Sequence, residues 1–426
     1  MEKFIIEKSG PLNGEVFIDG AKNSVLPIIA STILTGEKCI IENIPYLTDV
    51  EIMLQILGVL GAEYEVFERE KKVIINCNKI INTTLPYELV KKIRASFLIA
   101  GPLLARFGKV KIQMPGGCNI GIRPIDLHLK GFGLLGASIS QEHGNITITT
   151  KKLKGSNIYL DFPSVGATEN IIMSAVIAEG ETNISNCSVE PEIIDLADFL
   201  NKMGAKIEGA GTDNIKITGV KKLLGTSHRI IPDRIEAGTF MIGAVITKGK
   251  LLIKNIIPEH LTPIIAKLKD MNVTVNILDK GKNSIYNNAD IEIFSKNTLT
   301  NTDIKTLPFP GFPTDMQAQF MALMAITEGT GIINETIFEN RFMHAGELNR
   351  MGADIKIESK SAIIKGVKKL TGTQVKATDL RAGAALILSA LIAEGETEIS
   401  DIYHIERGYY HIEEKLQALG AKIKKI

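Results

Sequence analysis

One short loop holds a cysteine, an arginine and a histidine among glycines and prolines. It reads Met114-Pro-Gly-Gly-Cys118-Asn-Ile-Gly-Ile-Arg123-Pro-Ile-Asp126-Leu-His128, and we call it the Cys118 loop. An exposed thiol with the ordinary pKa of about 8.5 is mostly protonated at neutral pH, whereas a nearby guanidinium stabilises the thiolate and lowers that pKa. The loop therefore predicts an exposed, reactive Cys118 that acts either as a nucleophile or as a proton donor, in a segment able to serve as a lid.

Charged or hydrogen-bonding residues also stand at the start of six apolar segments. They are Lys22 with Asn23, Arg94, Ser164, Arg234, Asp315, and Asp379 with Arg381. A helix N-terminus already carries partial positive charge, so a cation there does little for the helix but suits an anionic ligand. Each residue taken alone is explained equally well as a local cap or ion-pair partner. Because cations recur at the same point of the pattern, we expect a shared anion-binding cleft.

Two further segments fit the same chemistry. Ser164-Val165-Gly166 opens an apolar helix with small residues, which lets a phosphate approach the backbone closely. Glu339-Asn-Arg341 and Glu406-Arg407 each place an arginine between a strand and a helix. Each arginine either pairs with its neighbouring glutamate or binds a carboxylate or phosphate through two hydrogen bonds.

The elements that position these residues repeat six times. Each repeat has an apolar helix, a glycine and a strand, followed by a second helix that ends at Gly or Asn. The helix–strand segments are Ala21–Pro45, Arg94–Met114, Ser164–Cys187, Arg234–Asn255, Asp315–Asn334 and Arg381–Ser400. The second helices are predicted to stop at Gly61, Gly136, Gly204, Asn272, Gly352 and Gly420. Asn suits this position because, after Gly, it best tolerates the left-handed backbone of a helix end.

The hydrophobic pattern predicts which helices are buried. The first helices are apolar on all sides, as in Val25–Ile33 and Ala384–Ala393, and such helices lie in a core. The second helices carry one polar face, as in Ile412–Leu419, so they lie nearer to solvent. We expect an α/β fold with two domains of three units each, helices inside and sheets outside. A single solenoid is the alternative, but no polar capping units are apparent.

Composition excludes several classes of protein. The chain has 426 residues, too many for one ordinary core, and a net charge of +1 gives no field for nucleic acid or an acidic membrane. No apolar run reaches the ~18–20 residues of a membrane span, and the N-terminus lacks a signal-peptide core, so we expect a cytoplasmic protein. Cys39, Cys77 and Cys187 are scattered, which predicts three buried thiols and neither disulfides nor a metal site.

Several motifs resemble those of one family. They are Gly20-Ala-Lys22-Asn23-Ser, Pro115-Gly-Gly-Cys118, Arg123-Pro-Ile-Asp-Leu-His128, Phe312-Pro-Thr-Asp315-Met-Gln-Ala-Gln, Phe338-Glu-Asn-Arg341-Phe-Met-His and Thr378-Asp379-Leu-Arg381-Ala. Over essentially its whole length the chain resembles the UDP-N-acetylglucosamine 1-carboxyvinyltransferases, the enolpyruvyl transferases of peptidoglycan synthesis. The resemblance implies two inside-out α/β barrel domains, formed by residues 22–232 and by residues 1–21 with 233–426.

The resemblance also implies a reaction. In the family, the sugar 3′-OH adds to C2 of phosphoenolpyruvate, C3 is protonated, and phosphate is then eliminated. Lys22, Arg123 and Arg407 are expected around phosphoenolpyruvate and its phosphate, with Arg381 near the carboxylate. Such cations are needed because the substrate carries two anionic groups.

Two further residues are expected to take part in the chemistry. The resemblance makes Cys118 a general acid or a product-release group, and Asp315 a base near the 3′-OH. An aspartate buried beside several cations stays ionised and is a weak base unless desolvation raises its pKa. We therefore expect Asp315 to bind substrate in the first place, and its role as base stays open.

The same resemblance assigns the nucleotide sugar. Asn23, Asp315 and Ile337 are expected near the GlcNAc ring, and Arg94 with Ser164, Val165 and Gly166 along the UDP portion. Pro124, Ile125, Asp126 and Leu127 are expected close to uridine. Arg341 and Asp379 complete the binding set. His128 is expected to orient the loop, through a hydrogen bond that is structural or catalytic. No cofactor and no obligate protein partner is expected.

Three other functions stay open. A transferase acting on shikimate 3-phosphate shares the architecture and the cationic cleft, but the Pro-Gly-Gly-Cys118 motif is typical of the UDP-N-acetylglucosamine branch. A non-catalytic UDP-sugar sensor would have lost chemistry residues, yet Lys22, Cys118, Asp315 and Arg407 are all present. An RNA-end-processing enzyme with related repeats is disfavoured by the near-neutral charge and by the lack of interleaved basic and aromatic residues.

Overall fold

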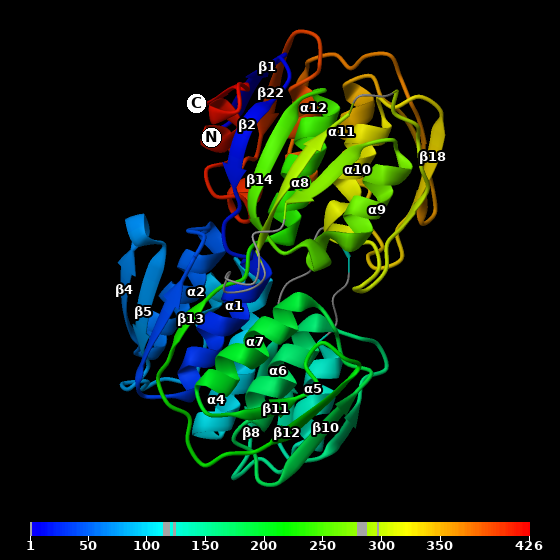
Figure 1. Cartoon of the computed structure of the whole chain (residues 1–426). Coiled ribbons are helices and arrows are strands. Elements are labelled where there is room, and N and C mark those ends of the chain that lie inside the picture. Colours follow the sequence, from blue (N-terminus) through cyan, green and yellow to red (C-terminus); the bar gives the residue numbers. More distant parts are fainter. Residues whose placement is uncertain (1, 114–119, 122–124, 279–287, 296–297) are drawn as a thin grey trace. The chain divides into compact units, whose positions relative to one another are not determined.

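Figure 1 shows the computed structural model, which describes residues 2–113, 120–121, 125–278, 288–295 and 298–426. The chain divides into two compact units. Unit 1 contains the described residues of 1–19, 118–122 and 232–426, and unit 2 those of 20–117 and 123–231. None of the helices in these described ranges has the length and apolar character that a membrane crossing requires.

The described part of unit 1 contains three sheets, each with four strands. Their strand orders are β21-β22-β1-β23, β15-β16-β14-β2 and β17-β18-β20-β19. The strands are β1 (Phe4–Glu7), β2 (Asn13–Phe17), β14 (Lys250–Ile256), β15 (Thr274–Leu278), β16 (Ala289–Phe294), β17 (Ile304–Lys305), β18 (Thr330–Asn334), β19 (Asp354–Glu358), β20 (Ser361–Lys365), β21 (Gln374–Lys376), β22 (Glu396–Ser400) and β23 (Lys422–Lys425).

Unit 2 has two four-stranded sheets and one three-stranded sheet in its described part. The strand orders are β13-β3-β5-β4, β11-β12-β10-β9 and β6-β8-β7. The strands are β3 (Lys38–Glu42), β4 (Glu63–Phe67), β5 (Lys72–Asn76), β6 (Lys109–Gln113), β7 (Ser138–Glu142), β8 (Asn145–Thr149), β9 (Asn157–Tyr159), β10 (Glu181–Ser185), β11 (Lys206–Glu208), β12 (Asn214–Thr218) and β13 (Ser227–Arg229).

One pairing pattern recurs in every four-stranded sheet. A short parallel pair, such as β17 with β18, is followed by two antiparallel pairs, such as β18 with β20 and β20 with β19. In the three-stranded sheet, an isolated parallel bridge between Thr84 and Lys111 stands in the place of the missing strand. The N-terminal strand β1 lies between β22 and β23 and so completes the last repeat with the first residues of the chain.

The first helix of each repeat is buried, as predicted. In unit 1 these helices are α8 (Arg234–Ile246), α10 (Gln317–Met324) and α12 (Leu380–Ala390), which pack on one another within the hydrophobic core (Figure 1). In unit 2 they are α1 (Lys22–Ser31), α4 (Ala100–Phe107) and α6 (Val165–Ala175). Every residue of α10 is buried, as is every residue of α8 after Arg234. A side chain at the start of such a helix therefore lies at the edge of a rigid core.

The second helices end as the sequence predicts. They are α2 (Thr48–Leu60), α5 (Asp126–Leu134), α7 (Pro191–Lys202), α9 (Thr262–Asp270), α11 (Met343–Arg350) and α14 (Ile412–Ala418). The residues predicted as stops all have positive φ: Gly61 109°, Gly136 92°, Gly204 101°, Asn272 69°, Gly352 95° and Gly420 99°. The left-handed conformation at Asn272 confirms that it replaces a glycine of the repeat.

Shorter helical turns connect these elements. Two are α-helical, α3 (Tyr87–Val90) and α13 (Tyr403–Glu406), and five are 3-10 helices, η1 (Thr32–Leu34), η2 (Glu68–Glu70), η3 (Arg94–Ile99), η4 (Pro258–Leu261) and η5 (Thr314–Met316). The turns η3 and η5 run directly into α4 and α10, so the predicted helix starts at Arg94 and Asp315 lie in a tighter first turn.

A largely buried ion group in unit 1 holds two of the segments at which the chain passes from one unit to the other. Lys415 on α14 donates to Asp19 at 2.8 Å and also pairs with Glu236 on α8. The backbone N–H of Asp19 donates to Glu236 at 2.9 Å, and that of Asp233 donates to the Asp19 carbonyl at 2.8 Å. The segments before Gly20 and after Pro232 are thus held to the same helix of unit 1.

Replacing Lys415 with Met should destabilise the protein by about 3–5 kcal/mol, because two acidic groups would remain buried without their cation. The measurement is urea unfolding followed by far-UV circular dichroism. Lys369→Met is the matched control, since the Lys369–Glu394 pair lies at the surface of the same unit and exposed pairs contribute little. Equal unfolding midpoints for the two variants would contradict the structural role of Lys415.

Candidate functional site

The carboxylate of Asp315 lies between two buried guanidinium groups in unit 1. Its Oδ1 accepts from Arg341 Nη2 at 2.7 Å, and its Oδ2 accepts from Arg381 Nη2 at 3.0 Å and from Nε at 3.2 Å. Arg341 and Arg381 are 5% and 2% exposed, whereas 25% of the Asp315 side chain remains accessible. We call these three residues the unit-1 site. The structure thus brings together three residues that sequence analysis had assigned separately to binding or catalysis.

The surroundings of Asp315 decide its protonation state. Burial alone opposes ionisation, but the charges and hydrogen bonds of Arg381 and Arg341 outweigh burial and hold the pKa of Asp315 far below its usual range. The side chain is therefore a carboxylate at every pH near neutrality. In this arrangement it is a strong hydrogen-bond acceptor and a poor proton acceptor.

Arg341 is held by a second set of contacts. Its Nη1 donates to Thr314 Oγ1 at 2.9 Å, and Thr314 in turn donates to Glu335 Oε2 at 2.8 Å. Glu335 also accepts from the backbone N–H of Ile337 at 2.8 Å. Sequence analysis did not find Glu335, although its carboxylate fixes the backbone of Ile337, a predicted substrate-binding residue. Arg341 was predicted either to pair with the neighbouring Glu339 or to bind a carboxylate or phosphate. In the structure it binds a carboxylate, that of Asp315.

Arg381 and Asp379 lie together at the start of α12. Asp379 caps the helix by accepting from the backbone N–H groups of Arg381 at 2.9 Å and Ala382 at 3.1 Å, as an N-cap residue does. Burial would lower the pKa of Arg381, but Tyr409, Asp315 and Asp233 raise it. Arg407, the last predicted cation of unit 1, is half-buried at the end of α13.

Unit 2 presents a separate charged pair at the start of α1. Lys22 Nζ lies 2.8 Å from Asp49 Oδ2, and both side chains are buried. Asp49 stands in the first turn of α2, where a negative charge also suits the helix dipole. The neighbouring Asn23 is exposed. Sequence analysis predicted Lys22 but not its partner Asp49.

His128, at the start of α5, is a buried and neutral imidazole. Its Nδ1 accepts from the side-chain amide of Asn170 at 2.9 Å, and its ring meets Phe97 edge-on with centroids 5.0 Å apart. Burial, with a smaller contribution from the charge of Arg94, lowers the pKa of His128 to about 3. A Cβ at Gly166 would lie 3.2 Å from the His128 ring. The structure therefore supports a structural role for His128, in which its ring accepts a hydrogen bond from Asn170.

The remaining predicted binding residues of unit 2 stand at helix starts. Ser164 caps α6 by accepting from the Ala167 N–H at 3.4 Å, so Val165 and Gly166 form its first turn. Arg94 begins η3 and is half-buried. Asp126 and Leu127 begin α5, and Ile125 is its buried N-cap residue. The free N–H groups of such starts suit anions.

Part of the prediction falls outside the described residues. Cys118, Arg123 and Pro124 lie there, so the thiol stays a prediction. The other three cysteines are buried, as predicted. Burial raises the pKa of Cys39, Cys77 and Cys187 to about 11, which keeps these thiols protonated and unreactive near neutral pH.

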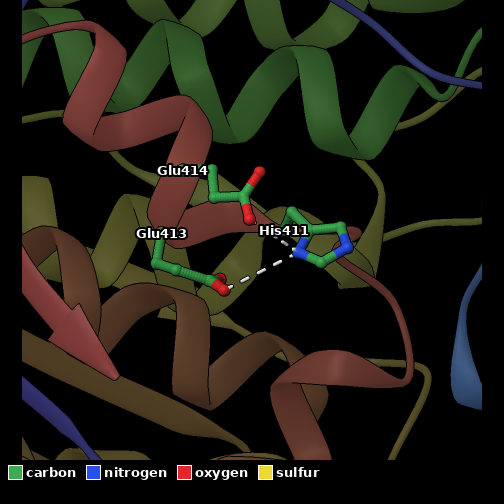
Figure 2. A group of neighbouring side chains, drawn as sticks. All are labelled: His411, Glu413 and Glu414. Carbon is green, nitrogen blue, oxygen red and sulfur yellow. Dashed lines mark ion pairs between the residues drawn. The ribbon is translucent and has the colours of Figure 1, made fainter. Parts of the chain in front are cut away.

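Among the described residues, one surface group has the composition of a metal site. Figure 2 shows His411, Glu413 and Glu414 at the start of α14, where their ligand atoms all lie within 4.8 Å of one another. His411 Nδ1 is 3.3 Å from Glu414 and 3.8 Å from Glu413. Acidic residues are favoured in the first turn of a helix, and a nearby exposed histidine pairs with them. The helix dipole accounts for this group.

Several polar residues that support these sites escaped sequence analysis. Asn170 on α6, Thr239 on α8 and Gln319 on α10 each interrupt a buried, apolar helix. A polar side chain at a core position must find a hydrogen-bond partner inside the protein. That interruption of the apolar pattern was the available signal, but the sequence does not show which residue each one contacts.

The chain is similar to proteins of known name. A family model described as EPSP synthase (3-phosphoshikimate 1-carboxyvinyltransferase) matches residues 6–416. UDP-N-acetylglucosamine 1-carboxyvinyltransferase 2 of Carboxydothermus hydrogenoformans is 57% identical over 426 residues, with 100% of each chain covered. UDP-N-acetylglucosamine 1-carboxyvinyltransferase 1 of Caldanaerobacter subterraneus subsp. tengcongensis is 58% identical over 421 residues, with 99% of each covered.

Solved structures share the fold. The enolpyruvyl transferase NikO from Streptomyces tendae has a TM-score of 0.88 and 24% identity, with 100% of this chain and 98% of that chain covered. An EPSP synthase from Acinetobacter baumannii has a TM-score of 0.80 and 20% identity, with 100% of both chains covered. The mixed α/β fold of this chain is therefore that of the enolpyruvyl transferases.

His128 should make stability depend on pH. Its folded-state pKa of about 3 lies below the unfolded value of about 6.5, so the unfolded chain takes up the proton first as the pH falls. The stabilisation is complete above pH 6.5 and is lost progressively toward pH 3. Between pH 7 and pH 5, wild type should lose about 2 kcal/mol more stability than His128→Gln, as measured by urea unfolding.

The exposed His143 provides the control in the same unit. His143→Gln should follow the pH dependence of wild type. If His128→Gln lost as much stability as wild type over this pH range, His128 would not be the group responsible.

Proposed function

This chain belongs to the EPSP synthase family and, within it, to the UDP-N-acetylglucosamine 1-carboxyvinyltransferases, and we propose that it transfers the enolpyruvyl group of phosphoenolpyruvate to the 3′-OH of UDP-N-acetylglucosamine. Phosphate is released in the reaction. Whole-length identity of 52–58% to several relatives of that name supports this assignment. We propose further that the product commits the sugar nucleotide to peptidoglycan synthesis, that the reaction takes place in the cytoplasm, and that it serves cell shape, the cell cycle and cell division.

The shared carboxylate of the unit-1 site is the observation that best supports this chemistry. Two buried guanidinium groups face one carboxylate, so the group carries a net positive charge that suits a second anion. Phosphoenolpyruvate offers a carboxylate and a phosphate. Arg381 is proposed to bind the carboxylate, while Lys22, Arg123 and Arg407 bind the phosphate.

Addition and elimination follow as two balanced steps. O3′ of the sugar forms a bond to C2 and passes its proton to Asp315, while the electrons of the C2–C3 double bond take a proton from the Cys118 thiol at C3. The C2–O bond to phosphate then breaks, the leaving phosphate takes up the proton that came from the 3′-OH, C3 returns a proton to the Cys118 thiolate, and the C2–C3 double bond is restored. Because its pKa is held far below the usual range, Asp315 acts first by accepting a hydrogen bond that orients the 3′-OH. It takes the 3′-OH proton only as the O3′–C2 bond forms, because the hydroxyl then becomes strongly acidic and even a weak base suffices.

The nucleotide sugar is proposed to bind through the residues that the family resemblance assigns to it. Asn23, Asp315 and Ile337 contact the GlcNAc ring, and Arg341 and Asp379 hold the unit-1 site in place. Arg94 and the first turn of α6, Ser164 to Gly166, bind the UDP portion, with Pro124 to Leu127 near uridine. The first turn of α6 suits this role because its N–H groups and small side chains allow a phosphate to approach. No cofactor is required by this chemistry.

The same proposal covers the architecture. Three repeats form each domain as an inside-out α/β barrel, with residues 22–232 in one domain and residues 1–21 with 233–426 in the other. Buried first helices and the recurring sheet pattern support this arrangement. The alternative acceptor is shikimate 3-phosphate, the substrate class in the name of the family model. The high-identity relatives favour the UDP sugar.

Phosphate release identifies the acceptor. Purified protein with phosphoenolpyruvate and UDP-N-acetylglucosamine should release phosphate, whereas shikimate 3-phosphate should give only the background rate. Asp315→Asn should lower kcat/KM at least about 100-fold, because the acceptor for the 3′-OH is weakened and two buried arginines lose their anion. Asp354→Asn, an exposed strand residue of the same unit, should match wild type. Release with shikimate 3-phosphate alone would overturn the proposal.

Cys118 should be the thiol that an electrophile modifies. A phosphonate epoxide of the fosfomycin type resembles an anionic substrate and should alkylate Cys118, because the other three thiols are buried with pKa values of about 11. Peptide mass spectrometry after brief exposure is the measurement. Cys118→Ala should remain unmodified, and adducts spread evenly over all four cysteines would exclude a special thiol.

A further inference from the structure

Three buried polar groups meet inside the helical core of unit 1. The Tyr409 hydroxyl lies 2.9 Å from Thr239 Oγ1 and 3.1 Å from the side-chain nitrogen of Gln319. That nitrogen also lies 3.1 Å from Thr239 Oγ1. Tyr409, Thr239 and Gln319 are 2%, 1% and 0% exposed. We call these three residues the polar triangle; none of them belongs to the substrate contacts proposed above.

The hydrogen bonds of the polar triangle have a defined direction. Thr239 donates its single hydroxyl proton to the Ile235 carbonyl at 2.8 Å, so its oxygen can only accept from the other two residues. The Tyr409 hydroxyl must then donate to Thr239, and Gln319 donates to both oxygens. The hydroxyl proton of Tyr409 is thus used in the hydrogen bond to Thr239. The phenol oxygen keeps its lone pairs, and these attract a cation.

The cation beside Tyr409 is Arg381. The central guanidinium carbon of Arg381 lies 5.3 Å from the centroid of the Tyr409 ring, a distance at which a cation is attracted to an aromatic face. Arg381 also donates through Nε and Nη2 to Asp315. The third nitrogen, Nη1, is buried and makes no hydrogen bond to any described residue. Asp315 and Tyr409 thus both contact the guanidinium, and Nη1 is the nitrogen that neither of them binds.

We propose that Tyr409, aligned by Thr239 and Gln319, is a positioning residue that fixes Arg381 so that Nη1 remains available for the carboxylate of the enolpyruvyl donor. This inference rests on the proposed function. A phenylalanine would fill the same core volume without desolvating a hydroxyl, so packing alone does not require the polar triangle. An arginine has many rotamers, and fixing it before the substrate arrives reduces the entropy lost on binding.

Tyr409→Phe removes one hydroxyl and keeps the ring. We expect KM for phosphoenolpyruvate to rise about tenfold, since a charge-assisted contact is loosened, while KM for UDP-N-acetylglucosamine changes less than about twofold and kcat less than about threefold. Thr239→Val should act in the same direction because it removes the acceptor that aligns the phenol. Thr239→Ser, unlike Thr239→Val, retains that acceptor, so its KM for phosphoenolpyruvate should lie within about twofold of the wild-type value.

A double-mutant cycle tests whether the two residues act through one another. Tyr409→Phe combined with Thr239→Val should raise KM for phosphoenolpyruvate no more than Tyr409→Phe alone. Ser389→Ala is the matched control, because it removes another buried hydroxyl from α12, the helix that carries Arg381, and that hydroxyl makes no hydrogen bond to any described residue. It should leave both KM values unchanged.

The outcomes separate this inference from the proposed function. A wild-type protein without phosphoenolpyruvate-dependent phosphate release would overturn the proposed function itself. An active wild type with unchanged KM for phosphoenolpyruvate in Tyr409→Phe would overturn only the role of Tyr409. Equal increases in both KM values, or an equal effect of Ser389→Ala, would show a general loss of structure and would also overturn it.

Discussion

One carboxylate makes the buried cations of unit 1 compatible with a folded protein. Removing two guanidinium groups from water costs several kcal/mol each, and repulsion between them adds to that cost. Asp315 offsets both because each of its oxygens accepts from a different arginine. Within the unit-1 site itself, two positive charges and one negative charge leave one positive charge over, and Asp233 is a further acidic neighbour of Arg381. The same interaction that stabilises the fold therefore leaves the site ready for an anionic ligand.

This interaction also ties together segments that are distant in sequence. Asp315 lies in η5, Arg341 follows β18, and Arg381 lies at the start of α12. Further contacts hold each segment in place. Glu335 accepts a hydrogen bond from Thr314, and Asp379 accepts one from the backbone N–H of Arg381. Unit 2 uses the same principle, since Lys22 at the start of α1 pairs with Asp49 at the start of α2. Charged groups are thus held where a rigid helix begins.

Sequence alone predicts the features that depend on neighbouring residues. The helix stops at Gly61 and Asn272 were predictable because a helix end in the left-handed conformation favours Gly or Asn at that one position. Pairings across the fold were not predictable in this way. Thr239 and Tyr409 are separated by 170 positions, and His128 and Asn170 by 42. Their polarity in apolar surroundings indicated that partners exist, but only the packing of the helices determines which residues meet.

The location of these supporting groups explains how the side chains of the candidate sites keep a fixed orientation. His128 and Arg381 are each held from within the core, by Asn170 on α6 and by Tyr409 with Thr239 and Gln319. Core helices are closely packed, so a group anchored to them keeps its position when surface segments change conformation. We infer that orientation of the anionic substrate depends on side chains that the core helices anchor.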